Sequence, residues 1–200
     1  LHVRGTEPEN LMGHLFKAIR SESNMFAAWR HVKKSALNSG SNEIRGAAAQ
    51  FEHEHQRYLR RFIRQLQQGK FEFDKVHGVL ADKEKREKVG KDPRPIAIAT
   101  LKNRVVQRAI LQILQPRKAR DTSEVDSRFE TVLNPALGRI NAVNSSKYGV
   151  GGLIKPHGGV GRGIEAIMLA MSQGAELFYR SDIKGFFNDI PQSPVVDFVR

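Results

Sequence analysis

The stretch FYRSDIKGFFNDIP, residues 178–191, contains the acid, Asp182, on which the interpretation of the whole chain depends. The apolar residues Leu177–Tyr179 before it favour a β-strand, and a β-branched residue follows it directly. A carboxylate at the end of a strand suits a hard cation such as Mg2+, which prefers oxygen ligands and keeps part of its water shell. An acid in this position also commonly forms a turn, so the stretch alone is compatible with either role.

The composition favours a nucleic-acid partner. Of the 200 residues, 33 are Lys or Arg and 21 are Asp or Glu, which gives a formal net charge of +12, with an anionic membrane surface as the second candidate partner. The absence of Cys excludes a disulfide framework, a thiolate zinc site and a Cys nucleophile. No run of about 18 apolar residues and no secretory leader is present, so we expect a cytoplasmic location and no membrane span.

The N-terminal part of the chain is predicted to be helical. Apolar residues three or four apart predict amphipathic helices over 10–37 and 47–68, with a loop at 35–46. Gly69 predicts the end of the second helix. Its arginines form either a solvated face or a stripe that faces phosphates. They are Arg57, Arg60, Arg61 and Arg64.

A predicted hairpin follows. The alternation of Ile and Ala over 96–99 predicts a strand that enters a packed sheet, with the charged run KEKREKVGK, 83–91, as the hairpin arm before it. Arg94 between two prolines is either a surface residue or part of a phosphate clamp. Thr100 predicts the N-cap of the next helix.

The second half of the chain is predicted to alternate turns with helices. The segment 129–143 is predicted to be partly helical, 144–163 is rich in turn residues, and a helix is predicted over 164–171, followed by the strand that starts at Leu177. The glycines of GGVGRG, 158–163, lack the GKS or GKT tail of a P-loop and the spacing of a dinucleotide fingerprint. They either turn the chain or let the backbone approach a nucleic acid.

Three segments in this order resemble the reverse transcriptases of bacterial retrons, group II introns and their defence-associated relatives. RPIAIATLKNRVVQRAILQIL, 94–114, is similar to the second conserved block, and SSKYGVGG with GRGIEAI, 145–167, is similar to the third. SDIKGFFNDI, 181–190, is similar to the palm motif that holds the first catalytic Asp. The third block is split by an insertion, Ala99 replaces a usual Pro, and Asn188 stands where relatives often have Asp.

The resemblance implies an α/β (α+β) right-hand polymerase. It places a helical N-terminal extension at 1–80, a fingers-like region at 81–175, and the first palm strand with the following helix at 176–200. The activity implied is that of an RNA-directed DNA polymerase, which transfers nucleotides onto a primer 3′-hydroxyl with two metal ions. One carboxylate cannot hold two divalent ions, so further acids are expected beyond residue 200.

The resemblance also assigns roles to residues. Asp182 is the implied catalytic acid and, with the backbone carbonyl of Ile183, binds Mg2+, Mn2+ being the alternative metal. Phe187 is the implied gate against a ribose 2′-hydroxyl. Arg94 is implied to bind the triphosphate together with Lys88 or Lys91. The implied nucleic-acid-binding residues are Arg104, Arg108, Tyr148 and Arg162.

The implied partners are an RNA template, a DNA or RNA primer and deoxynucleoside triphosphates, together with a dedicated non-coding RNA or a partner protein. Antiviral defence in bacteria is one biological role that the family suggests. Two other functions fit the same residues. One is a polymerase-like protein that holds RNA without catalysis, and the other is an RNA-primed or protein-primed enzyme that makes untemplated or short repetitive DNA.

Replacing Phe187 by Ala should admit ribonucleotides, because the ring that excludes the 2′-hydroxyl is lost. Single-nucleotide incorporation by the intact protein measures this as a fall in the preference for deoxynucleotides over ribonucleotides. Unchanged selectivity would show that Phe187 is not the gate.

Overall fold

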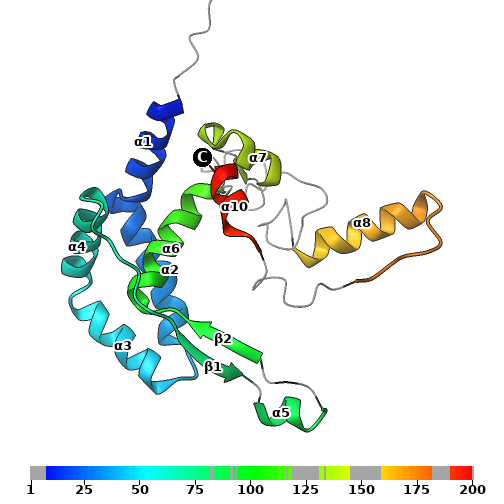
Figure 1. Cartoon of the computed structure of the whole chain (residues 1–200), viewed down its shortest axis with the longest axis horizontal. Helices are drawn as coiled ribbons and strands as arrows, with labels where there is room; N and C mark the ends of the chain where they lie inside the picture. The colour runs from blue at the N-terminus through cyan, green and yellow to red at the C-terminus, as the bar shows by residue number, and fades with distance from the viewer. Residues whose placement is uncertain are drawn as a thin grey trace, which may run out of the picture. The chain divides into compact units, whose positions relative to one another are not determined.

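A computed structural model describes residues 8–81, 83–90, 92, 94–115, 117–118, 131–132, 134–144, 159–181 and 190–199. The chain divides into two compact units, Leu1–Ile113 and Leu114–Arg200. The described residues are mostly helical and form two small antiparallel sheets of two strands each, which is compatible with the mixed α/β class expected from the sequence (Figure 1). The first unit combines the predicted helical extension with the predicted hairpin and the helix after it.

Two serine caps help to define the helices of the first unit. The hydroxyl oxygens of Ser21 and Ser41 accept hydrogen bonds from the backbone N–H groups three residues later, as N-caps do. The described elements are α1 (Pro8–Ile19), α2 (Glu22–Leu37), α3 (Asn42–His53), α4 (His55–Gln67), β1 (His77–Ala81), α5 (Lys83–Glu87), β2 (Arg94–Ile98) and α6 (Leu101–Leu114).

The predicted helical content of this region is confirmed, but two boundaries were wrong. The loop predicted at 35–46 is shorter, since α2 continues to Leu37 and α3 begins directly after its cap. The single helix predicted at 47–68 is broken at Glu54, whose backbone leaves the helical region at φ −118° and ψ 20°. The break turns the chain so that Phe51 of α3 and Leu59 of α4 are buried in one core. Gly69, at φ 65°, ends α4 as predicted.

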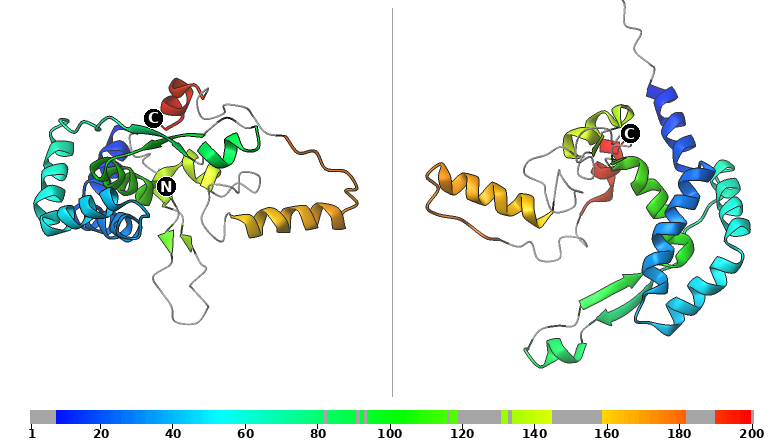
Figure 2. Two further views of the ribbon diagram at one scale, coloured as in Figure 1. Left: turned by 90° about the horizontal axis from the view of Figure 1, so that it is seen from below. Right: turned by 180° about the vertical axis from the view of Figure 1, so that it is seen from behind.

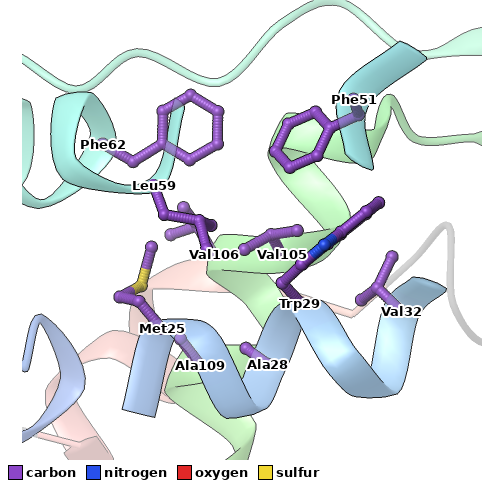
Figure 3. Packing of buried hydrophobic residues seen from close by; sticks show 10 residues of the cluster. All are labelled: Met25, Ala28, Trp29, Val32, Phe51, Leu59, Phe62, Val105, Val106 and Ala109. Atoms are coloured by element: carbon purple, nitrogen blue, oxygen red, sulfur yellow. The ribbon is translucent and has the colours of Figure 1, made fainter. Parts of the chain in front are cut away.

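The core of the first unit is formed by four helices. Side chains from α2, α3, α4 and α6 converge on one cluster (Figure 3). The indole of Trp29, 2% exposed, lies 4.3 Å from the ring centroid of Phe51 and buries a large apolar area. The cluster consists of Met25, Ala28, Trp29, Val32, Phe51, Leu59, Phe62, Val105, Val106 and Ala109.

A polar network closes one side of this core. The indole N–H of Trp29 donates to Oε2 of Glu52 at 2.7 Å, and the ammonium group of Lys33 donates to the other carboxylate oxygen. Burial alone would raise the pKa of Glu52. The hydrogen bonds from Lys33 and Trp29 and the positive charge of Lys33 outweigh burial, so the pKa lies below its ordinary value. Glu52 is therefore a charged partner that fixes the orientation of the indole.

The hairpin extends away from these helices and carries α5 at its far end (Figures 1 and 2). β1 pairs with β2 in antiparallel register from His77 opposite Ile98 to Ala81 opposite Arg94. The predicted strand is thus confirmed, but the prediction that the charged run forms the other arm was wrong. Residues 83–90 of this run form α5 and a following turn, and β1 supplies the partner strand instead. The sheet is also less packed than predicted, since Ile96 remains 45% exposed.

The start of α6 is fixed by a buried amide. Asn103, 2% exposed, accepts a hydrogen bond from the backbone N–H of Asp74 at 2.9 Å and donates one to the carbonyl of the same residue at 2.8 Å. The hydroxyl of Thr100 accepts from the N–H of Asn103, which confirms the predicted N-cap. The same hydroxyl donates to the carboxylate of Asp74 at 2.8 Å.

The second unit contains short elements and two longer helices. The partly helical segment predicted at 129–143 is confirmed in part by η1 and α7. The helix predicted at 164–171 is confirmed by α8, which begins earlier, at Val160, within the segment predicted to be rich in turns. The run Leu177–Tyr179, predicted as a strand, has no regular structure and is 85–93% exposed, since no strand pairs with it among the described residues. The described elements are β3 (Arg117–Lys118), β4 (Thr131–Val132), η1 (Pro135–Leu137), α7 (Arg139–Asn144), α8 (Val160–Ser172) and α10 (Gln192–Val199).

Two further features of the described residues bear on the fold. The guanidinium of Arg139 in α7 lies 5.8 Å from the ring centroid of Phe198 in α10, which joins these two helices of the second unit. None of the described helices is both long and apolar enough to cross a membrane.

Replacing Trp29 by Ala should lower the free energy of unfolding by about 3–5 kcal/mol, because it leaves a cavity among the core helices. Trp29→Phe is the matched variant: it keeps an aromatic ring and removes the indole N–H, so it should cost about 1–2 kcal/mol. Urea unfolding followed by circular dichroism measures both values. A loss below about 1 kcal/mol for Trp29→Ala would contradict the burial described for this side chain.

Candidate nucleic-acid interface

Two amide side chains fix α2 against α6. Nδ2 of Asn24 donates to the backbone carbonyl of Ala109 at 2.9 Å, and Nε2 of Gln112 donates to Oδ1 of Asn24 at 2.8 Å. Asn24 also donates to the carbonyl of Ile19 at the end of α1. These bonds and the core between the helices set their register, so that polar residues of α2 adjoin those of α6.

A positively charged surface results, which we call the α2–α6 basic face and define as His31, Lys34, Arg104 and Arg108. Arg104 donates to the hydroxyl of Ser35 at 2.8 Å, and Nε of Arg108 donates to the amide oxygen of Gln112 at 3.3 Å. Both acceptors are neutral. The two guanidinium groups are therefore positioned without having their charge compensated, which suits contacts with phosphate oxygens.

The titration of His31 reports the positive potential of this face. Its pKa lies below the ordinary value because of partial desolvation and because the charges of Arg108 and Lys34 disfavour a further positive charge. A bound anion would offset these charges.

Four acids of the first unit form ion pairs with cations outside this face. Glu54 binds Arg57 at 2.8 Å, Glu22 binds Arg60 at 3.3 Å, Glu52 binds Lys33, and Asp74 binds Lys102 at 2.7 Å. The two exposed pairs, those of Arg57 and Arg60, contribute little to stability, but all four pairs neutralise the cations involved. The uncompensated positive charge is thereby concentrated on surfaces that include the α2–α6 basic face.

The structure positions part of the predicted triphosphate site. Arg94 begins β2 at the end of the hairpin that carries α5, and Lys88 follows α5 in the turn at that same end. The backbones of both residues thus lie at the tip of the hairpin. The alternative lysine, Lys91, lies outside the described residues.

The remaining predicted site residues belong to the second unit, Leu114–Arg200. Arg162 belongs to α8 of the second unit, where it donates to Glu165 at 2.8 Å. Tyr148, Asp182, Ile183 and Phe187 lie outside the described residues, so their roles, and Mg2+ binding, stay predictions. Within the described part of the chain, no group of three or more potential metal-ligating side chains occurs.

Sequence reasoning identified Arg104 and Arg108 but missed His31 and Lys34. The signal was present in the spacing: these two residues and Ser35 occur at i, i+3 and i+4 along α2, away from its buried residues. Their proximity to α6 depends on tertiary contacts, which the spacing does not reveal.

The described part of the first unit is a predominantly helical domain with a projecting hairpin and a positively charged surface. Comparison of the chain with models of protein families, with curated proteins and with solved structures finds no match.

Two changes should raise the pKa of His31: binding of nucleic acid, because phosphates offset the local positive charge, and Arg108→Ser, because it removes one of the charges responsible. NMR titration of the imidazole signal measures both. Arg57→Ser removes the same charge from α4, where it pairs with Glu54, and is the matched control. A pKa of His31 that stays constant in the presence of bound nucleic acid would place the ligand elsewhere.

Proposed function

We propose that the chain is the fingers and the start of the palm of an RNA-directed DNA polymerase with a helical N-terminal extension. The observation that carries the proposal is the α2–α6 basic face, on which Arg104 and Arg108 are held by neutral partners. Both arginines belong to the segment that resembles the second conserved block of reverse transcriptases. The order of the three sequence blocks supports the same assignment.

In this proposal the basic face binds the phosphates of template or primer. Contacts of this kind release counterions, so the affinity falls steeply as the salt concentration rises. The tip of the hairpin supplies Arg94 and a lysine, Lys88 or Lys91, to the triphosphate of the incoming deoxynucleotide. The hairpin is suited to this task because its tip lies away from the core of the first unit (Figure 2).

The chemistry is assigned to the stretch around Asp182. Its carboxylate and the carbonyl of Ile183 would hold Mg2+, which supplies charge for activating the primer 3′-hydroxyl and stabilising the leaving pyrophosphate. Phe187 would restrict the sugar of the incoming nucleotide. Cytoplasmic antiviral defence, with a non-coding RNA or a partner protein, is the biological setting proposed with this activity.

The alternative function is a polymerase-like protein that holds RNA without catalysis. The described basic face supports it equally, because phosphate binding needs no catalytic acid. A further alternative is an RNA-primed or protein-primed enzyme that makes untemplated or short repetitive DNA. Sequencing the product made with and without bound RNA distinguishes it from an enzyme that copies a template.

Replacing Asp182 by Ala should abolish primer extension in Mg2+ by the intact protein and leave RNA binding unchanged, because the change removes a metal ligand and no phosphate contact. Primer extension and electrophoretic mobility shifts measure the two properties. Glu176→Ala removes an exposed acid six residues earlier and should retain synthesis. Synthesis at the unmodified rate by the Asp182 variant would contradict its role, and binding of RNA without synthesis by the unmodified protein would favour the alternative.

A further inference from the structure

A cavity of about 910 Å³ lies within the first unit, between α3, α4, the open end of the hairpin and the start of α6. Its apolar lining includes Ile44, Phe51, Tyr58, Ile98 and Leu101. A volume of this size is typical of sites for small organic groups, and an apolar wall with few polar groups is their usual lining. Apart from Arg104, which also belongs to the α2–α6 basic face, no lining residue has a role in the function proposed above.

An aromatic pair forms one wall. The ring of Tyr58 stacks on Phe51 with the ring centroids 5.0 Å apart and the ring planes 28° apart. Phe51 belongs to the core, whereas Tyr58 is partly exposed, so the core fixes the position of a ring that a ligand can reach. Stacking on an aromatic side chain is a general way of binding a nucleobase without selecting its sequence.

The charged part of the lining is mainly positive. Arg61, Lys102 and Arg104 line the cavity together with one acid, Glu43. Lys102 is neutralised by Asp74, but Arg61 has no hydrogen-bond or ion-pair partner among the described residues. The lining therefore complements an anion attached to a flat apolar group.

The positive charge continues along α4 beyond the cavity. Arg64 lies one turn after Arg60 and three residues after Arg61, outside the cavity lining, and it too has no ion-pair partner among the described residues. Arg57 and Arg60 on the same helix are each neutralised by a glutamate. A second phosphate at Arg64 would belong to the neighbouring nucleotide, which favours a strand over a free mononucleotide.

Gln65 provides a group for the polar edge of a base. Its side chain lines the cavity, and its amide oxygen is buried without a hydrogen-bond partner in the described part of the chain. A buried acceptor without a partner is unfavourable, so turning this amide toward a ligand would cost no existing hydrogen bond.

We propose that this cavity binds one unpaired nucleotide of a single-stranded nucleic acid, with the base on Tyr58 and the flanking phosphates on Arg61 and Arg64. The inference rests on the nucleic-acid binding of the proposed function and is independent of catalysis. A base can stack on the Tyr58 ring only when its face is not covered by a neighbouring base, so a single strand binds more tightly than a duplex of equal length.

Fluorescence anisotropy of the full chain with a labelled oligouridylate tests the contacts. Tyr58→Leu should weaken binding about tenfold through loss of stacking, and Arg61→Ser about fivefold with a shallower salt dependence. Arg57→Ser is the matched control, because it removes the same charge outside the cavity, and it should change affinity less than about twofold. Equal effects of Arg61→Ser and Arg57→Ser would overturn the assignment.

Photocrosslinking of the unmodified chain tests the location without relying on the folding of any variant. An oligonucleotide with 4-thiouridine should crosslink to peptides that contain α3 or α4. Crosslinks confined to α2, none of whose residues lines the cavity, would overturn the cavity as a site while nucleic-acid binding stands. Competition by free uridine monophosphate at the same nucleotide concentration would overturn the commitment to a strand. A crosslink in the cavity in a protein that does not extend primers would support this inference and contradict the polymerase proposal alone.

Discussion

The two hydrogen bonds between the side chain of Asn103 and the backbone of Asp74 are the constraint on which the arrangement of the first unit depends. Both bonds involve a buried amide, and a buried amide that loses its partners pays the full desolvation penalty, so the segment before β1 is held against the start of α6. The carboxylate of Asp74 then meets Lys102 and Thr100. Hydrogen bonds from Lys102 and from Thr100 hold the pKa of Asp74 below its ordinary value, which keeps this second set of contacts charged near neutral pH.

The position of the hairpin and of both candidate binding surfaces follows from this constraint. α6 contributes Val105 and Val106 to the core on one side and Arg104 and Arg108 to the basic face on another, as residues of a helix with 3.6 residues per turn do. Asn103 lies next to these residues and ties the same helix to the segment that leads into the hairpin. Residues that follow Asp74 in the chain and residues that adjoin Asn103 both line the cavity. The shape of the cavity therefore depends on the two hydrogen bonds of the Asn103 side chain.

Periodicity and capping predicted much of this unit, whereas its polar contacts could not be predicted. The apolar spacing gave the helices, and Thr100 and Gly69 marked two helix ends correctly because capping and positive φ are local properties. The break at Glu54 is set by core packing rather than by a breaker residue. The residues of Leu177–Tyr179 favour a strand by local propensity, but a strand also needs a partner. No strand pairs with this run among the described residues, so it has no regular structure. His31 and Lys34 join the site through contacts such as that between Asn24 and Ala109, which are 85 residues apart in the sequence.

The ion pairs determine where the positive charge of the first unit can act. A net charge of +12 by itself predicts attraction to polyanions but gives no location. In the structure, Glu22 and Glu54 neutralise Arg60 and Arg57, and these two pairs contribute little to folding because they are exposed. Asp74 neutralises Lys102, whose side chain is 26% exposed. The larger effect of these pairs is on binding, because the cations left uncompensated include Arg104 and Arg108 on the α2–α6 basic face and Arg61 beside the cavity. Arg104 belongs to both surfaces, so the basic face adjoins the cavity at this residue.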